Sequence, residues 1–150
     1  MTIRAIQPLQ APHYDLLLSA DPNKQLVDDY IKRGLCFELI FNNTVAGILV
    51  LLPTRPETLE IVNIAVSESY QGQGLGEKLI QFALAYATNH SYKTVEIGTG
   101  STSLGQLYLY QKCGFRMTSI DRDFFLRHYQ DEIVENKLVL KDMVRLSIDI

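Results

Sequence analysis

The segment of residues 59–87 constrains the fold of this chain more than any other. It begins with an apolar run that ends at Val66 and predicts a buried strand. From Leu75 onward, apolar side chains recur at three- and four-residue steps, which predicts a helix with one apolar stripe. Between the two lie glycines at every second position, Gly72, Gly74 and Gly76. The segment therefore predicts a strand, a glycine loop and a helix, in that order.

The glycine loop has the chemistry of an anion site. Glycine lets the backbone approach a ligand closely and adopt dihedral angles that are unfavourable for other residues. At a helix start, unpaired N–H groups and the positive end of the helix dipole point toward one place. The loop is therefore predicted to bind a pyrophosphate. The alternative is a glycine-rich helix entry without a ligand.

Two common phosphate-binding motifs do not fit the spacing. In the dinucleotide motif Gly-x-Gly-x-x-Gly the third glycine follows two intervening residues, and here it comes one residue too early. A P-loop ends in Gly-Lys-Ser/Thr, whereas this chain reads Gly76-Glu77-Lys78 and offers no hydroxyl for magnesium. The phosphate ligand therefore belongs to another class.

Two short motifs resemble signatures of the GNAT family of N-acetyltransferases. The loop is similar to the Gln/Arg-x-x-Gly-x-Gly/Ala motif of that family and reads Gln71-Gly72-Gln73-Gly74-Leu75-Gly76. Downstream, a segment similar to the family's Leu-Tyr-x-Lys-x-Gly-Phe reads Leu109-Tyr110-Gln111-Lys112-Cys113-Gly114-Phe115. The strand end Ile64-Ala65-Val66 resembles the one that the family places before its loop. Two motifs in this order are far more specific than one, and the resemblance covers residues 1–120 well and the rest weakly.

The resemblance implies acetyl-CoA as cosubstrate, with its pyrophosphate on the amides of residues 72–76, and no metal. The coenzyme-binding residues that it implies are Ile64, Ala65, Val66, Gln71, Gly72, Gln73, Gly74, Leu75, Gly76, Ser103 and Tyr110. The N–H of Ala65 or Val66 would polarise the thioester carbonyl. Ser103 and Gln106 stand where many relatives carry asparagine and alanine, so these two positions depart from the family pattern.

Acetyl transfer from a thioester to an amine requires a base for the amine, an acid for the leaving thiolate and donors for the oxyanion. No serine–histidine–acid arrangement presents itself, and neither Cys36 nor Cys113 follows a nucleophile turn, which favours direct attack without a covalent enzyme intermediate. The resemblance places Tyr110 near the coenzyme sulfur, and its phenol is protonated at neutral pH. Tyr110 is therefore the predicted acid, and a tyrosine packed in the core is the alternative.

Glu60 is the candidate base, because Glu60-Ile61-Val62-Asn63-Ile64-Ala65-Val66 is similar to the histone-acetyltransferase branch of the family. Period-two alternation places Glu60 on an otherwise apolar face, where its pKa would rise toward a value suited to a base. A solvated glutamate, with a water chain as base, is the alternative. Asn63 would reach the acceptor if a bulge turns the strand there.

Composition narrows the classes of function. A chain of 150 residues suits a single domain, 1–150, and a net charge of −3 with scattered basic residues argues against nucleic acid or an anionic membrane as partner. Two cysteines and three dispersed histidines lack metal-ligand spacing. No signal peptide or membrane-spanning run is present in the sequence, so we expect a cytoplasmic protein.

The remaining segments predict further strands and helices. Strands are expected at residues 2–6, 35–41, 44–52, 94–97, 137–140 and 143–148, and helices at 13–19, 23–33 and 103–112. Asp21-Pro22-Asn23 predicts a turn and an N-cap before the helix at 23–33, and Gly34 predicts its end. Asn42-Asn43 predicts a hairpin turn, Pro53-Thr54-Arg55-Pro56 a break, and Gly98-Thr99-Gly100-Ser101 a flexible exit. The pattern fits an α+β (α/β three-layer) fold with a mixed, mainly antiparallel central sheet flanked by helices, as the GNAT resemblance implies.

Residues 119–136 mix charge and aromatic side chains in one short span. This span is either a surface segment or one wall of the acceptor site, with Asp121 and Phe124 as substrate-binding residues. The expected function is N-acetylation of a primary amine on a small molecule or protein, and Glu57, Glu60, Asp121 and Asp123 would favour a cationic acceptor if they line one mouth. A non-catalytic acyl-CoA sensor is the alternative function. The apolar end of the chain, residues 143–150, permits a homodimer.

Overall fold

The computed structural model describes residues 1–150 and is organised around a seven-stranded sheet in the order β1-β2-β3-β4-β5-β9-β6. Its strands are β1 (Thr2–Ala5), β2 (Leu35–Phe41), β3 (Thr44–Arg55), β4 (Thr58–Val66), β5 (Thr94–Gly100), β6 (Arg116–Asp121) and β9 (Met143–Asp149). Only β4 and β5 pair in parallel, and every other pair is antiparallel. The predicted mixed, mainly antiparallel sheet is thus confirmed. A separate two-stranded ribbon consists of β7 (Val134–Glu135) and β8 (Leu138–Val139).

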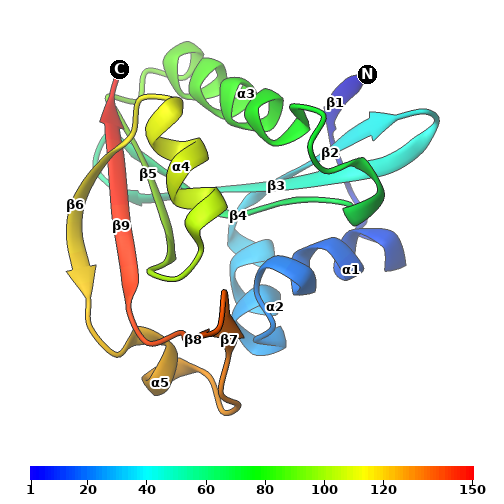
Figure 1. Cartoon of the computed structure of the whole chain (residues 1–150). Helices are drawn as coiled ribbons and strands as arrows, with labels where there is room; N and C mark the ends of the chain where they lie inside the picture. Colours follow the sequence, from blue (N-terminus) through cyan, green and yellow to red (C-terminus); the bar gives the residue numbers. More distant parts are fainter.

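Helices cover both faces of the sheet and make three layers. They are α1 (Ala11–Ala20), α2 (Lys24–Arg33), α3 (Leu75–Asn89) and α4 (Leu104–Lys112), with two short ones, η1 (Glu68–Tyr70) and α5 (Phe124–His128). Figure 1 shows α3 on one side of the long strands β3 and β4, and α1 and α2 on the other. The larger apolar core lies under α3, where the predicted stripe buries Leu75, Leu79 and Ala83, and a smaller core lies under α1 and α2. The predicted three-layer architecture is confirmed.

The sheet splits between its two parallel strands. β4 and β5 are paired only from Thr58 opposite Thr94 to Ile61 opposite Ile97. Beyond Ile61, β4 carries one extra residue, because Leu51 of β3 faces Ile61 while the adjacent Val50 faces Asn63. This bulge leaves the end of β4 without a partner on β5. The candidate site lies in the opening between the diverging strands.

Several local predictions are confirmed. The Asn23 side chain accepts a hydrogen bond from the backbone N–H of Leu26 and caps α2. Asn42 and Asn43 both have positive φ angles, 51° and 58°, as a two-residue hairpin requires. Gly34 ends α2 as predicted, but its φ of −96° is not the left-handed conformation that usually favours glycine at a helix end. An added Cβ would lie 2.9 Å from the Leu51 carbonyl oxygen, so close packing explains this glycine.

Two predictions about strands were wrong, and one strand was missed. Pro53 does not break the chain, because β3 continues through it to Arg55, and the register shift there accommodates the missing N–H. Residues 98–100 are not a flexible exit but belong to β5 and pair with β9. β6, at the edge of the sheet, was not predicted, because its residues are largely exposed and lack an apolar alternation.

No helix combines the length and the apolar character that a membrane span requires.

Candidate functional site

The glycine loop presents a row of backbone donors at the start of α3. Gly72 and Gly74 have φ angles of 78° and 81°, in the region that favours glycine, and Gly74 is the N-cap of the helix. The first backbone bond beyond the cap is donated by Lys78 to the Gly74 carbonyl, and the N–H groups of residues 72–77 have no acceptor within the protein. Together with the helix dipole, these amides form a site for an anion.

A cavity of about 730 Å³ lies beside this row of amides, and we call it the loop cavity. Of the residues predicted to bind coenzyme, the loop cavity is lined by Ile64, Ala65, Val66, Gln71, Gly72, Gly74, Leu75, Gly76 and Tyr110. Gln73 and Ser103 do not line it. The Gln71 side chain donates to the Val66 carbonyl at 3.1 Å and so ties the loop to the end of β4.

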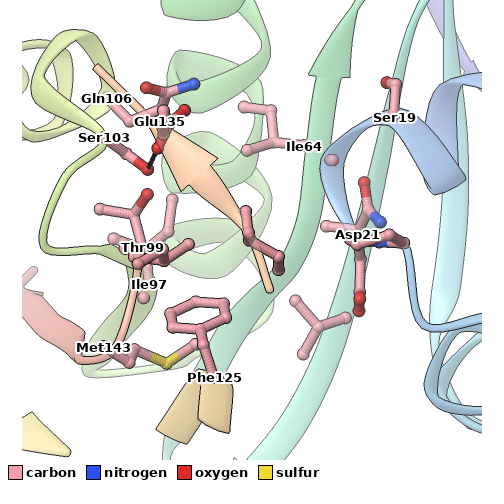
Figure 2. A pocket seen from close by; sticks show the side chains of 18 of the residues that line it. Ser19, Asp21, Ile64, Ile97, Thr99, Ser103, Gln106, Phe125, Glu135 and Met143 are labelled. Carbon is pink, nitrogen blue, oxygen red and sulfur yellow. Dashed lines mark hydrogen bonds between the residues drawn. The ribbon is translucent and has the colours of Figure 1, made fainter. Parts of the chain in front are cut away.

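A second cavity of about 360 Å³ lies between the diverging strands, and we call it the sheet cavity. It is bounded by the end of α1, by β4 from Ile61 to Ile64, by β5 from Ile97 to Gly100, and by parts of α4, α5 and β7. Figure 2 shows Ser19 and Asp21 on one side of it and Ser103, Gln106 and Glu135 on the opposite side. The two cavities have five lining residues in common, which are Ser19, Ala20, Ile64, Gln106 and Tyr110. The two cavities therefore meet.

Tyr110 stands where the two cavities meet. Its side chain is 5% exposed, and its hydroxyl makes no hydrogen bond within the protein. Burial raises the pKa of the Tyr110 phenol above its usual value, so the group stays protonated at neutral pH. A neutral phenol at this place is able to donate a hydrogen bond or a proton to a bound molecule.

The bulge in β4 directs Asn63 toward α1 and α2. The Asn63 amide nitrogen donates to the Leu17 carbonyl at 3.0 Å and to the Tyr30 hydroxyl at 2.8 Å, and the residue lines the sheet cavity. Its Oδ1 atom is buried and has no hydrogen-bond partner. The predicted bulge is therefore present, and it brings Asn63 to the cavity wall.

Glu60 lines neither cavity. It lies between Leu52 of β3 and Glu96 of β5 in the paired part of the sheet. Burial raises the pKa of the Glu60 carboxyl; the nearby Glu96 adds to this rise, while Arg145 and Arg55 oppose it. The direction of the pKa shift suits a base, but the position leaves no direct contact with a molecule in the sheet cavity. The role of Glu60 stays a prediction.

The two substrate-binding residues predicted from residues 119–136 lie elsewhere. Asp121 is held by Arg127 and Arg145, so its charge is already compensated, and hydrogen bonds from those arginines keep its pKa below the usual range. Phe124 packs against Phe125 with ring centroids 5.1 Å apart, and only Phe125 lines the sheet cavity. The segment does form part of the cavity wall, as one interpretation of the sequence expected, but through Phe125, Tyr129 and Glu135.

Neither cysteine lines the loop cavity or the sheet cavity, and burial raises the pKa of both the Cys36 and the Cys113 thiol, so neither is a ready thiolate. No group of three or more His, Cys, Asp or Glu side chains is placed to hold a metal ion.

The profile of the Acetyltransferase (GNAT) family matches residues 4–115, which run from β1 to the end of the second motif. This chain belongs to the GNAT family. The resemblance of the two short motifs to that family is thereby confirmed.

This GNAT chain is similar to several bacterial proteins. It is 54% identical over 137 residues to an uncharacterized N-acetyltransferase, YvbK, of Bacillus subtilis, covering 91% of this chain and 88% of that protein. A crystal structure of a Bacillus subtilis acetyltransferase in complex with CoA superposes with a TM-score of 0.95 at 51% identity, covering 99% of this chain and 97% of that one. A GNAT family acetyltransferase from Elizabethkingia anophelis with acetyl-CoA bound also gives a TM-score of 0.95, at 44% identity and the same two coverages.

Sequence reasoning missed part of the wall of each cavity in this GNAT chain. Ser19, Ala20 and Gly105 line the loop cavity, and Asp21 and Tyr129 line the sheet cavity. Asp21 was interpreted only as a turn residue before α2, since an Asp-Pro-Asn sequence predicts a turn. No local pattern connects it with Tyr129, which lies 108 residues away in the sequence.

Proposed function

We propose that this chain transfers the acetyl group of acetyl-CoA directly to a primary amine in a ternary complex. The observation that carries the proposal is the meeting of the two cavities at Tyr110. The loop cavity, with its row of free amides, suits the pyrophosphate of the coenzyme. The coenzyme-bound structures of the similar proteins support this choice of ligand. The sheet cavity then holds the acceptor amine.

In the proposed reaction the amine nitrogen attacks the thioester carbonyl carbon and the carbon–sulfur bond breaks. The amine loses one proton, the departing thiolate gains one, and the products are an N-acetylated amine and free CoA. Tyr110 is the proposed donor of the proton to the thiolate, because its protonated phenol stands where the two cavities meet. The N–H of Ala65 or Val66 is proposed to polarise the thioester carbonyl, since both residues line the loop cavity.

The base that accepts the amine proton is proposed to be Glu60, reached through water, or a water chain alone. Water must intervene because Glu60 does not line the sheet cavity. A covalent acetyl-enzyme is not part of the proposal, since neither Cys36 nor Cys113 lines the loop cavity or the sheet cavity. Direct transfer within one complex requires both substrates to be bound together, which the shared wall of the two cavities permits.

The test is release of free thiol from acetyl-CoA across a panel of primary amines, with calorimetric titration of CoA in parallel. We expect CoA binding and thiol release that depends on one class of amine. Binding without release from any amine would support the non-catalytic sensor. A chain that binds no CoA would contradict the assignment of the loop cavity. Initial rates that give intersecting double-reciprocal lines would support the ternary complex, and parallel lines would contradict it.

A further inference from the structure

The sheet cavity has a negative wall without any compensating cation. Among its 23 lining residues there are two carboxylates, Asp21 and Glu135, and no lysine, arginine or histidine. Neither carboxylate forms a salt bridge anywhere in the protein, whereas Asp121 and Glu38 are each paired with arginine. Figure 2 shows the two carboxylate residues on opposite sides of the cavity. A small cavity with two uncompensated negative charges favours a positively charged occupant.

Neutral donors hold both carboxylates in place. Asp21 accepts hydrogen bonds from the hydroxyl of Tyr30 at 3.0 Å and from the hydroxyl of Tyr129 at 2.7 Å. Burial raises the pKa of both phenols, and Asp21 adds to the rise, so each stays a neutral donor that orients Asp21 without cancelling its charge. On the other side, one oxygen of Glu135 accepts from the Ser103 hydroxyl and from the Thr102 hydroxyl. The second oxygen of Glu135 has no partner.

Asn63 lines the same wall and carries a buried acceptor that has no partner. The residue is 4% exposed, and its Oδ1 is the one buried side-chain nitrogen or oxygen atom in the protein without a hydrogen-bond partner. The orientation of the amide is determined by its surroundings. The Leu17 carbonyl can only accept, and Tyr30 gives its single hydroxyl hydrogen to Asp21, so the Asn63 nitrogen must face both. A buried acceptor left unpaired is costly unless a ligand supplies the donor.

We propose that the acceptor is a small aliphatic amine that carries a second ammonium group, a diamine or polyamine, bound between Asp21 and Glu135. This inference rests on the proposed acetyl transfer, and it names the class of acceptor. An ammonium group has three N–H donors and no acceptor, which matches a cavity lined by two carboxylates and no cation. The apolar side chains that line the same cavity, among them Ile61, Ile97 and Met143, suit the methylene chain that joins the two nitrogens. The ring of Phe125 offers an additional contact for a cation.

Asp21 and Glu135 are thus assigned as specificity-determining residues, and they replace the acidic residues that the sequence suggested. Glu57 lies in the turn between β3 and β4, Glu60 lies in the paired sheet, and Asp121 is neutralised by arginine. None of these three lines the sheet cavity, and neither does Asp123, the fourth acidic residue that the sequence suggested.

The test compares 1,4-diaminobutane and spermidine with butylamine, which has the same carbon chain as the first but a single nitrogen. We expect kcat/KM in the thiol-release assay to be higher for the diamine by on the order of ten-fold to a hundred-fold, as hydrogen bonds to a charged group imply. Asp21→Asn and Glu135→Gln are each expected to reduce this preference at least several-fold through a higher KM for the diamine. Glu132→Gln is the matched control, because Glu132 is exposed, lies outside both cavities and loses the same charge.

Binding separates this inference from the proposed function. Titration of 1,4-diaminobutane and butylamine into the protein saturated with CoA measures the preference without turnover. A preference for the diamine that Glu135→Gln weakens would support the inference even if no amine releases thiol. Equal kcat/KM and equal affinity for the two amines would overturn the inference while leaving acetyl transfer intact. A lysine peptide preferred over the diamine would overturn it as well. Urea unfolding of each variant checks that a lost preference does not come from a lost fold.

Discussion

Replacing Gly74 with valine is expected to weaken both the fold and coenzyme binding, for separate reasons. Gly74 has φ 81° and ψ 9°, and an added Cβ would meet no atom within 4 Å, so the protein has room for a side chain. The cost to the fold is therefore backbone strain, about 1–2 kcal/mol for an L-residue in the left-handed region, and a β-branched residue lies at the upper end. In a domain of this size, each kcal/mol lowers Tm by about 2–4 °C.

The cost to binding comes from the place where the new side chain would lie. Gly74 lines the loop cavity beside the unpaired amides of residues 72–77, so the valine methyl groups would occupy space that a pyrophosphate needs. Loss of one charge-assisted hydrogen bond is worth about 1.5–3 kcal/mol, so we expect the Kd for CoA to rise about ten-fold or more. Calorimetric titration well below Tm measures this effect on the folded protein.

Gly105→Val is the matched control for the strain. Gly105 lies in the first turn of α4, lines the same cavity and has an equally open Cβ position, but its φ is not positive. Because valine tolerates helical dihedral angles better than glycine, we expect no loss of stability there. The reasoning about strain would be refuted if urea unfolding gave the two variants the same stability. The placement of the pyrophosphate would be refuted if Gly74→Val bound CoA as tightly as the wild type.

Three further changes test other parts of the chain. Tyr110→Phe is expected to lower kcat by about 10²–10⁴-fold while the Kd for CoA stays unchanged; full activity would remove Tyr110 from the mechanism. If Glu60 is the base, kcat falls as pH drops through a pKa that burial holds above the usual value near 4.3, and Glu60→Gln removes this limb of the pH–rate profile. Burial alone would raise the pKa of Glu38, but hydrogen bonds from His13 and Arg4 outweigh it and hold the pKa below its usual range. Glu38 therefore stabilises the fold above about pH 4.3, and this contribution is lost as pH falls through its folded pKa. Urea unfolding should show a smaller loss between pH 6 and pH 3 for Glu38→Gln than for the wild type.

The sequence predicts those parts of the fold that depend on neighbours along the chain. The strand, glycine loop and helix are determined by apolar spacing and by three glycines within one segment, and the structure has them in that order. The glycines of β5 led to the wrong prediction of a flexible segment, because their role depends on residues far away in the sequence. An added Cβ would lie 2.8 Å from the Met143 sulfur at Gly98 and 2.5 Å from Leu140 at Gly100, so these glycines serve close packing against distant residues. Nothing near them in the sequence distinguishes such packing from flexibility.

The two cavities also differ in how far they depend on residues that are neighbours in the sequence. The loop cavity is built largely from one continuous segment and one helix, and nine of its 17 lining residues were predicted from the sequence. The sheet cavity is assembled from α1, β4, β5, α5 and β7, and its carboxylates lie more than a hundred residues apart in the sequence. Asp21 is typical of a turn, and Glu135 lies in a segment without clear periodicity. Their common role becomes visible only when the strands that separate them are placed in space.

The bulge at Val62 connects the fold to the chemistry of the acceptor. With unbroken alternation, Asn63 would face α3 and add a polar group to the larger core, on the side where Ile61 packs. The extra residue turns Asn63 toward α1 and α2, where its amide binds Tyr30, and Tyr30 in turn orients Asp21. The same irregularity ends the pairing between β4 and β5 and opens the space that the acceptor needs. One inserted residue thus makes room for the proposed acceptor and, through Asn63 and Tyr30, positions Asp21, one of the two carboxylates that we propose select it.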